Sequence, residues 1–337
     1  MEESMKKIAF FGVVLVLVVF AFTGCKGRSA GANQDKKQTT IGMATFMMAQ
    51  EWYQNIVTGA QSRANELGVK LLVTDGNNDS AIQVQAVENF ITQGVDAIII
   101  SPVDSKALIT VVQQAKNKGI KVICESNMVE GADAKVGMSD FENGKVTGEW
   151  FAKYAKERNI APNILILGYK SLENCFNRSE GFKAALGASG INYTVAVEVD
   201  GGFREASLNA TIDALTAHPE INTVFGINDD STLGAIAAVK QANLPLSNFT
   251  LILYGLEGIA GRTALYEGNA SAGLSMFPEY VGTTCINSAM DAINGKVLPA
   301  EYVSPTIVVT QEDFNQYFIE ENGKFLVNFA AVDAKAN

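Results

Sequence analysis

From residue 40 onward, the chain alternates between short apolar runs and longer amphipathic stretches. Several apolar runs are nearly continuous, which is typical of parallel strands covered on both faces. Strands that alternate with helices predict parallel sheets with helices on both faces. We predict strands over 41–46, 69–73, 96–100, 121–124, 163–167, 193–199, 222–227, 250–253 and 272–276. The stretches between them predict helices, among them 80–93, 104–118, 178–189 and 278–294.

The same pattern occurs twice along the chain. The segment GVDAIIISPVDSKALITVVQQA, from Gly94, has a counterpart in EINTVFGINDDSTLGAIAAVKQ, from Glu220. In each, an apolar strand leads through a polar turn to an Asp-Ser pair, Asp104-Ser105 or Asp230-Ser231, suited to cap the next helix. We therefore expect two similar α/β lobes. Ligands of such sheets bind at the carboxyl ends of the strands, so two facing lobes would form an interdomain cleft.

The N-terminus has the features of an export signal. Lys6 and Lys7 precede an uncharged apolar run, 8–22, that is too short to span a bilayer. The Thr23-Gly24-Cys25 sequence that follows resembles the lipobox of bacterial lipoproteins, in which the Cys is acylated and becomes the new N-terminus. We predict a signal peptide over 1–24, a start at Met1 or Met5, and a flexible polar tether over 25–38. The alternative is an ordinary secreted protein with a chance Cys25.

Composition narrows the class of protein. The 337 residues exceed the length at which a single core stops growing, and the apolar fraction of 47% supplies material for two cores. A net charge of −10 argues against a nucleic-acid partner. Apart from Cys25, the chain has an odd number of cysteines without metal-ligand spacing, so neither a disulfide framework nor a metal site is indicated. We expect Cys124, Cys175 and Cys285 to be buried.

No catalytic constellation is apparent. The single histidine, His218, precedes Pro219 and is interpreted as a helix terminus rather than a general base. No glycine-rich dinucleotide or P-loop motif occurs, so no cofactor is indicated. The sequence therefore favours a binding protein over an enzyme.

Polar and aromatic residues follow several predicted strands and would meet at the cleft. Trp52 and Tyr53 follow the first strand, Glu125-Ser126-Asn127 follow 121–124, and further polar residues, Arg178, Asn228 and Glu257, follow later strands. Rings, amides and a few charges suit a small polyhydroxy ligand, since a sugar offers apolar faces to rings and hydroxyls to planar polar groups.

Helical spacing predicts that Trp52 and Tyr53 face different directions. If a helix begins near Glu51, one apolar stripe faces the core of its own lobe and includes Tyr53, and Trp52 lies off it, toward the cleft. The stripe consists of Tyr53, Ile56, Val57, Ala60, Ala64 and Leu67.

From Thr39 to about Thr310 the sequence resembles the ribose- and galactose-type periplasmic binding proteins, the sugar-binding components of ATP-driven importers. The resemblance rests on WYQNIVTGAQ, QGVDAIIISPVDS, SDFENGKVTGEWFA, NRSEGF, LTAHPEINTVFGINDDSTLGA and YGLEG. It implies two doubly wound parallel-sheet lobes joined by a three-strand hinge, the type I periplasmic binding protein fold. By strand counting, the first lobe comprises 39–140 plus 277–304 and the second 141–276 plus 305–337.

The resemblance also implies which residues bind the ligand. It assigns Trp52 as a stacking aromatic, Arg178 and Asn228 as sugar-binding polar residues, and Glu257 in place of the family's Asp. Phe203 is a candidate second platform, or else an ordinary buried aromatic. Arg178 could instead form a structural ion pair, and Asn228 a helix cap, although Asp230-Ser231 were expected to supply that cap.

Two departures bear on the ligand. Ser126-Asn127 stand where the family often has Asp-Arg, and Met276 stands where it has an amide. We therefore expect a sugar or related polyol, which the sequence does not identify as ribose. A nucleoside is an alternative. The implied partners are an ABC permease and ATPase, with the chain an exported, membrane-anchored monomer facing the periplasm or the cell exterior. A ligand-sensing role in signalling or chemotaxis is the alternative from another class.

Overall fold

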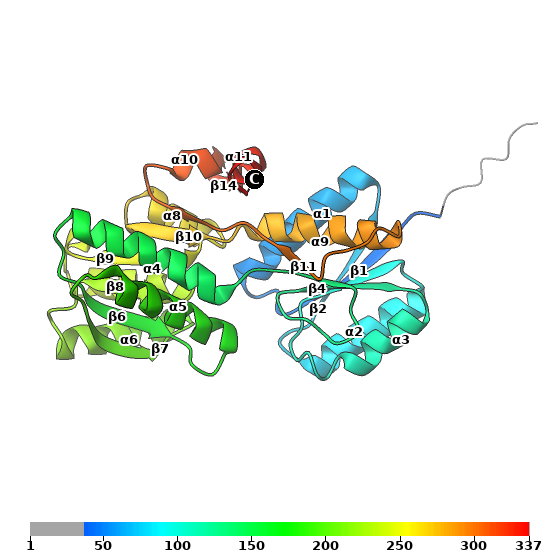
Figure 1. Ribbon diagram of the computed structural model, residues 1–337, viewed down its shortest axis with the longest axis horizontal. Helices are drawn as coiled ribbons and strands as arrows, with labels where there is room; N and C mark the ends of the chain where they lie inside the picture. Colours follow the sequence, from blue (N-terminus) through cyan, green and yellow to red (C-terminus); the bar gives the residue numbers. More distant parts are fainter. Residues whose placement is uncertain (1–36, 337) are drawn as a thin grey trace, which may run out of the picture. The chain divides into compact units, whose positions relative to one another are not determined.

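The computed structural model describes residues 37–336 (Figure 1). The predicted signal peptide, Cys25 and nearly all of the predicted tether lie outside the described residues. Two six-stranded sheets form the framework, and the first runs in the order β11-β5-β4-β3-β1-β2 with all pairs parallel. Its strands are β1 (Thr40–Thr45), β2 (Lys70–Asp75), β3 (Ala97–Ile100), β4 (Lys121–Glu125), β5 (Ala134–Gly137) and β11 (Glu301–Val303).

The second sheet repeats this topology. Its order is β12-β10-β9-β8-β6-β7, parallel except for the edge strand β12, which is antiparallel to β10. The two copies of the sequence repeat contain β3 and β8, which hold equivalent places in the two sheets, so the predicted duplication is a structural one. The strands are β6 (Asn163–Gly168), β7 (Thr194–Asp200), β8 (Thr223–Gly226), β9 (Thr250–Gly255), β10 (Ala272–Ser275) and β12 (Ile307–Val309).

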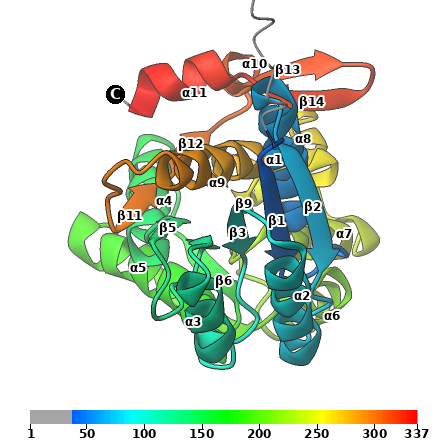
Figure 2. The same cartoon turned by 90° about the vertical axis from the view of Figure 1, so that its right-hand side faces the viewer.

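Helices cover both faces of each sheet (Figure 2). In the first lobe, Ile41 and Met43 of β1 pack toward α1 (Glu51–Leu67) and α9 (Pro278–Ile293). The opposite face of that sheet packs on α2 (Ser80–Gln93) and α3 (Ile109–Asn117). In the second lobe, α4 (Asp140–Glu157) and α5 (Glu173–Ser189) cover one face. The other face carries α6 (Arg204–Ala217), α7 (Asp229–Gln241) and α8 (Ile259–Tyr266).

The C-terminal segment adds a small unit beyond the second sheet. Tyr280 of α9 donates a hydrogen bond to the Asp333 carboxylate at 2.8 Å, and the Tyr266 ring of α8 packs on Phe325, with ring centroids 5.0 Å apart. The segment therefore contacts helices from both lobes. It consists of α10 (Phe314–Tyr317), the hairpin β13 (Phe318–Glu321) and β14 (Lys324–Val327), and α11 (Phe329–Ala336).

Glycines let neighbouring helices approach closely. A Cβ built on Gly59 of α1 would collide with the carbonyl oxygen of Glu279, and one on Gly282 of α9 would collide with that of Ile56. Between α4 and α5, Gly144 and Gly181 face backbone atoms of the partner helix in the same way. These helix pairs therefore pack backbone to backbone, which the hydrophobic pattern alone does not reveal.

The fold class and the nine predicted strands are confirmed, with end shifts of a few residues. Both predicted Asp-Ser helix caps are wrong. The α7 helix is capped by Asn228, whose side chain accepts from the Ser231 amide, and α3 begins only after Leu108, with Asp104 capping a preceding turn. The α1 stripe is correct near its start, but Leu67 at its end is 40% exposed. Three connections link elements of different lobes: 138–139, 276–277 and 304–306. The exact lobe boundaries given above remain a prediction.

Candidate functional site

The candidate residues lie near the carboxyl ends of the strands. Thr45 ends β1, Glu125 ends β4 and Gly255 ends β9, and the parallel pairing brings such ends to one edge of each sheet. A hydrogen bond joins the two edges: the Asn55 side-chain amide of α1 donates to the carbonyl of Glu257 at 2.6 Å. The first and second lobes are therefore in contact where their strands end.

Trp52 lies between the two hydrophobic cores. Its ring is partly buried and packs against the cluster of the first lobe around Met43 and also against the cluster of the second lobe around Tyr254. Tyr53 packs against the first cluster and stacks on Phe46, with ring centroids 5.3 Å apart. An indole held between two lobes presents a flat apolar surface where a bound molecule would meet both.

Tyr53 combines a packed ring with a phenol that faces charge. Burial raises the pKa of the Tyr53 phenol well above its usual value, and the charges of Glu125 and Glu257 add to that rise while Arg178 opposes it. Groups from both lobes therefore act on one hydroxyl. The packed ring of Tyr53 agrees with the predicted apolar stripe, while charges from both lobes act on its phenol.

Glu125 is the most deeply buried carboxylate of this group. It is 2% exposed, and its Oε2 atom has no hydrogen-bond partner among residues 37–336. Burial raises the pKa of Glu125 to about 7, and the nearby Ser101 hydroxyl and Trp52 indole only partly offset that effect. A buried carboxylate with a free oxygen is costly unless a donor reaches it.

The two predicted residues next to Glu125 are more accessible than Glu125: Ser126 is half-buried with φ of 66°, and Asn127 is exposed.

Arg178 lies inside α5, which begins five residues before the predicted helix 178–189. The guanidinium donates from Nε to Asp140 at 2.7 Å and from NH1 to the carbonyl of Ile227 at 3.0 Å. Its carbon also lies 5.0 Å from the ring centroid of Tyr254. The ion pair that was the alternative for Arg178 is thus present in the structure. The other terminal nitrogen, NH2, takes no part in these two hydrogen bonds.

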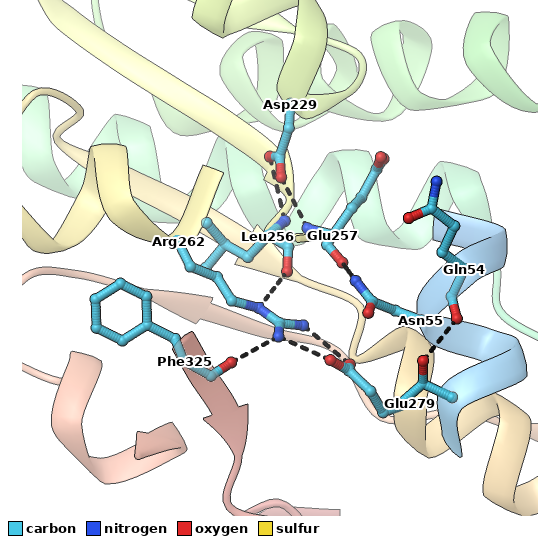
Figure 3. Close-up of polar contacts among 9 residues, drawn as sticks. Gln54, Asn55, Asp229, Leu256, Glu257, Arg262, Glu279 and Phe325 are labelled. Carbon is cyan, nitrogen blue, oxygen red and sulfur yellow. Dashed lines mark hydrogen bonds and ion pairs between the residues drawn. The ribbon is translucent and has the colours of Figure 1, made fainter. Parts of the chain in front are cut away.

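The loop after β9 carries Glu257 and is held from both sides (Figure 3). The buried Asp229 carboxylate accepts from the Leu256 amide at 3.2 Å and the Glu257 amide at 2.7 Å. On the other side, Arg262 Nε donates to the Leu256 carbonyl at 2.9 Å. Leu256 adopts φ of 44°, which is unfavourable for a branched side chain, so these bonds hold a strained turn in place.

Carboxylates crowd this loop. Burial raises the pKa of Glu257 well above its usual value, with Asp229 adding to the rise and Arg178 opposing it. Burial likewise raises the pKa of Asp229 to about 6, although two amides and Arg262 favour its charged form. Like charges brought together out of water disfavour ionisation.

Arg262 connects the same loop to the rest of the protein. It is 3% exposed and forms a two-pronged ion pair with Glu279 of α9, at 2.7 and 2.9 Å. NH1 also donates to the carbonyl of Phe325 in β14 at 2.8 Å, as Figure 3 shows. A residue of the second lobe is therefore bound to the first lobe and to the C-terminal hairpin at once.

Asn228 and Phe203 are the remaining predicted site residues of the second lobe. The Asn228 amide donates to the Gly202 carbonyl at 2.8 Å, while its oxygen accepts from both the amide and the hydroxyl of Ser231. Asn228 is thus a helix cap, as its alternative interpretation holds, and these bonds engage its oxygen. Phe203 is 55% exposed and contacts Tyr169 edge to face, so the interpretation of Phe203 as a buried aromatic is wrong.

Sequence reasoning missed several residues of this group. Glu125 is expected at the cleft with Ser126 and Asn127, but it is not among the residues assigned to the ligand, and it ends β4. Asp140 and Tyr254 have no local pattern that marks them, and only contacts across the fold reveal them. A buried strand that ends in a carboxylate is the one signal that could have found Glu125.

Within residues 37–336, the cysteines and the residues that could bind a metal form no second candidate site. Cys124, Cys175 and Cys285 are buried, as expected, and form no disulfide with one another. Across residues 37–336, no group of His, Cys, Asp and Glu is arranged to hold a metal ion. Within the same part of the chain, every helix is too short or too polar to cross a bilayer.

Two similar parallel α/β lobes with polar and aromatic side chains at their facing strand ends define a binding protein of the type I periplasmic class. The chain belongs to the periplasmic binding protein family, whose domain matches residues 41–297. Members are substrate-binding transport proteins rather than enzymes and act outside the cytoplasm.

Individual relatives agree with this family. The chain is 28% identical to the ribose import binding protein RbsB of Escherichia coli over 276 residues, 81% of this chain and 91% of that protein. It is 30% identical to the D-ribose/D-allose-binding protein of Pseudomonas aeruginosa, over 71% of this chain and 77% of that one.

Solved structures are similar as well. An ABC transporter solute-binding protein of Actinobacillus succinogenes with bound D-allose has a TM-score of 0.76 and 25% identity, covering 83% of this chain and all of that one. One from Bacillus halodurans with bound myo-inositol has a TM-score of 0.72 and 26% identity, covering 83% of this chain and 97% of that one.

Proposed function

We propose that this protein captures a small sugar or related polyol between its two lobes and delivers it to the permease of an ABC importer. The observation that carries the proposal is Trp52, which packs against the cores of both lobes beside buried polar groups. Relatives named for ribose and allose, and similar structures holding allose and myo-inositol, support the same class of ligand.

The polar groups near the strand ends suit a ligand with several hydroxyls. Three buried side-chain oxygens there have no hydrogen-bond partner among the described residues: Glu125 Oε2, Tyr254 Oη and Ser275 Oγ. Buried polar atoms without partners are costly, and a ring of ligand hydroxyls would satisfy them. Trp52 would pack on the apolar face of the same ring.

We assign the binding role to Trp52, Tyr53, Ser126, Asn127, Arg178, Phe203, Asn228 and Glu257. Within this proposal, Arg178 NH2 and the Glu257 carboxylate act from the second lobe, and Trp52 and Tyr53 from the first. Asn228 acts mainly by holding the loop that carries Phe203, because its amide binds the Gly202 carbonyl. Asn127 and Phe203, both exposed, would act at the rim.

Capture of the ligand requires no chemical reaction. Ligand would bind one lobe of an open form, and closure would bury it between both, giving the shape that the permease recognises. The ligand favours the closed form only to the extent that it binds that form more tightly. We further propose that Cys25 is lipidated, that the tether before residue 39 links the protein to the membrane, and that it acts as a monomer.

Calorimetric titration of the purified protein tests this function. D-ribose, D-allose and myo-inositol form the first panel, with adenosine as the nucleoside control. We expect saturable binding of at least one sugar or polyol, together with a rise in melting temperature through mass action. Binding of adenosine but of none of the three would refute the sugar assignment.

A further inference from the structure

The Glu125 carboxylate is buried and has an oxygen without a hydrogen-bond partner, which neutral sugar binding alone does not require. Glu125 is 2% exposed, ends the central strand β4, and leaves Oε2 without a hydrogen-bond partner in the described part of the chain. Ser101 and Trp52 are the nearby donors that favour its charged form, and both are neutral. A buried carboxylate is normally paired with a cation or fully hydrogen-bonded.

The two cations of this region, Lys135 and Arg178, are each paired with another carboxylate. Lys135 of the adjacent strand β5 is paired with Glu301 at 3.0 Å. Arg178 donates to Asp140 and to the Ile227 carbonyl.

The other groups that interact electrostatically with Glu125 are acids or neutral: Asp140 from α4, Tyr53 from α1, Cys285 from α9 and the adjacent Cys124. Glu257, across the lobes, adds a further carboxylate that acts on the same Tyr53 phenol. The group therefore holds more carboxylates than free cations.

We propose that Glu125 receives a protonated amino group of the ligand, so that the ligand class is an amino-bearing sugar or polyol. The inference rests on the proposed function and names the ligand of that same site. An ammonium would supply both the missing hydrogen-bond donor and the missing positive charge, and charge-assisted hydrogen bonds are the stronger kind. A uronate or sugar phosphate would instead place a further negative charge beside Glu125, which disfavours its binding.

The competing arrangement has Glu125 protonated and donating to a neutral sugar oxygen. The two differ in their pH dependence. Burial raises the pKa of Glu125 to about 7, so the fraction ionised increases between pH 5.5 and 7.0. If the ionised form binds an ammonium, affinity rises about tenfold across that range, whereas donation by the protonated form makes affinity fall.

Calorimetry on matched ligands tests the proposal. D-glucose, D-glucosamine and D-glucuronate share one ring and differ in one substituent, and galactose supplies a second such series. We expect the amino sugar of at least one series to bind at least about tenfold more tightly than its neutral parent at pH 7.0, with the uronate not binding. Glu125→Gln should abolish that preference and the pH dependence, and the control Glu130→Gln, on the exposed part of the same loop, should keep both.

Several results would overturn the inference. One is a neutral sugar or polyol, including ribose, allose or myo-inositol, that binds as tightly as every amino sugar. Another is an amino-sugar affinity that falls from pH 5.5 to 7.0 in the unaltered protein, a result that holds even if Glu125→Gln fails to fold. Both leave the proposed function standing. Failure of every sugar and polyol, neutral or amino, would refute the proposed function itself.

Discussion

Glu279→Gln tests whether the buried ion pair between the lobes stabilises the protein. The substitution keeps the shape and one acceptor but removes the charge that faces Arg262, whose side chain is 4% exposed. Removing one partner of a buried pair costs about 3 to 5 kcal/mol, since the other charge is left uncompensated. Asp229 acts electrostatically on Arg262 as well, so we expect the lower end, about 3 kcal/mol.

The measurement is urea unfolding followed by fluorescence, with thermal unfolding alongside. Spread over the roughly 300 described residues, about 3 kcal/mol corresponds to a fall of about 5 °C in Tm. The matched control is Asp230→Asn, which removes the acid of the Arg204 pair, where the side chains are 53% and 47% exposed. That change should cost less than about 1 kcal/mol. Equal effects of the two substitutions would show that burial of the Arg262 pair has no energetic consequence.

Three other predictions concern packing, ligand stacking and the anchor. Gly282→Ala should destabilise the protein by about 2 kcal/mol or more, because the new methyl group meets the backbone of α1, whereas Gly187→Ala, whose Cβ would have space in α5, should be neutral or stabilising by equilibrium unfolding. Trp52→Ala should weaken sugar binding by about 1 to 3 kcal/mol in calorimetry through lost stacking and burial, and an unaltered Kd would contradict the stacking role. Cys25→Ser should move the protein from the membrane to the soluble fraction, and continued partitioning into membranes would argue against lipidation.

The alternation of apolar and polar residues was sufficient for nine strands and for the duplication, but not for the short strands β5, β11, β12, β13 and β14. Continuous apolar runs such as 96–100 mark a strand buried on both faces, and the repeat from Gly94 and Glu220 corresponds to β3 and β8 at equivalent places in the sheets. These signals are local: they depend only on which residues a strand or helix must bury. Helix caps were less predictable. The residues Asn228, Asp230 and Ser231 all favour a cap, and backbone geometry selects Asn228.

The candidate site was predicted in part. Trp52, Arg178 and Glu257 were singled out from the sequence, yet the charge state around them depends on Glu125, Asp140 and Asp229, which come from other elements. Burial and the distances between carboxylates decide these pKa values, and neither is encoded in local spacing.

By itself, the sequence determined the order of the nine predicted strands and the two-lobed class, because periodicity and turn chemistry act over a few residues. Only the tertiary structure decided that Arg178 is paired with Asp140, that Glu125 is buried with a free oxygen, and that Arg262 joins both lobes to the C-terminal hairpin. The physical reason is range: hydrogen bonds and ion pairs between residues far apart along the chain form only once packing has brought their elements together.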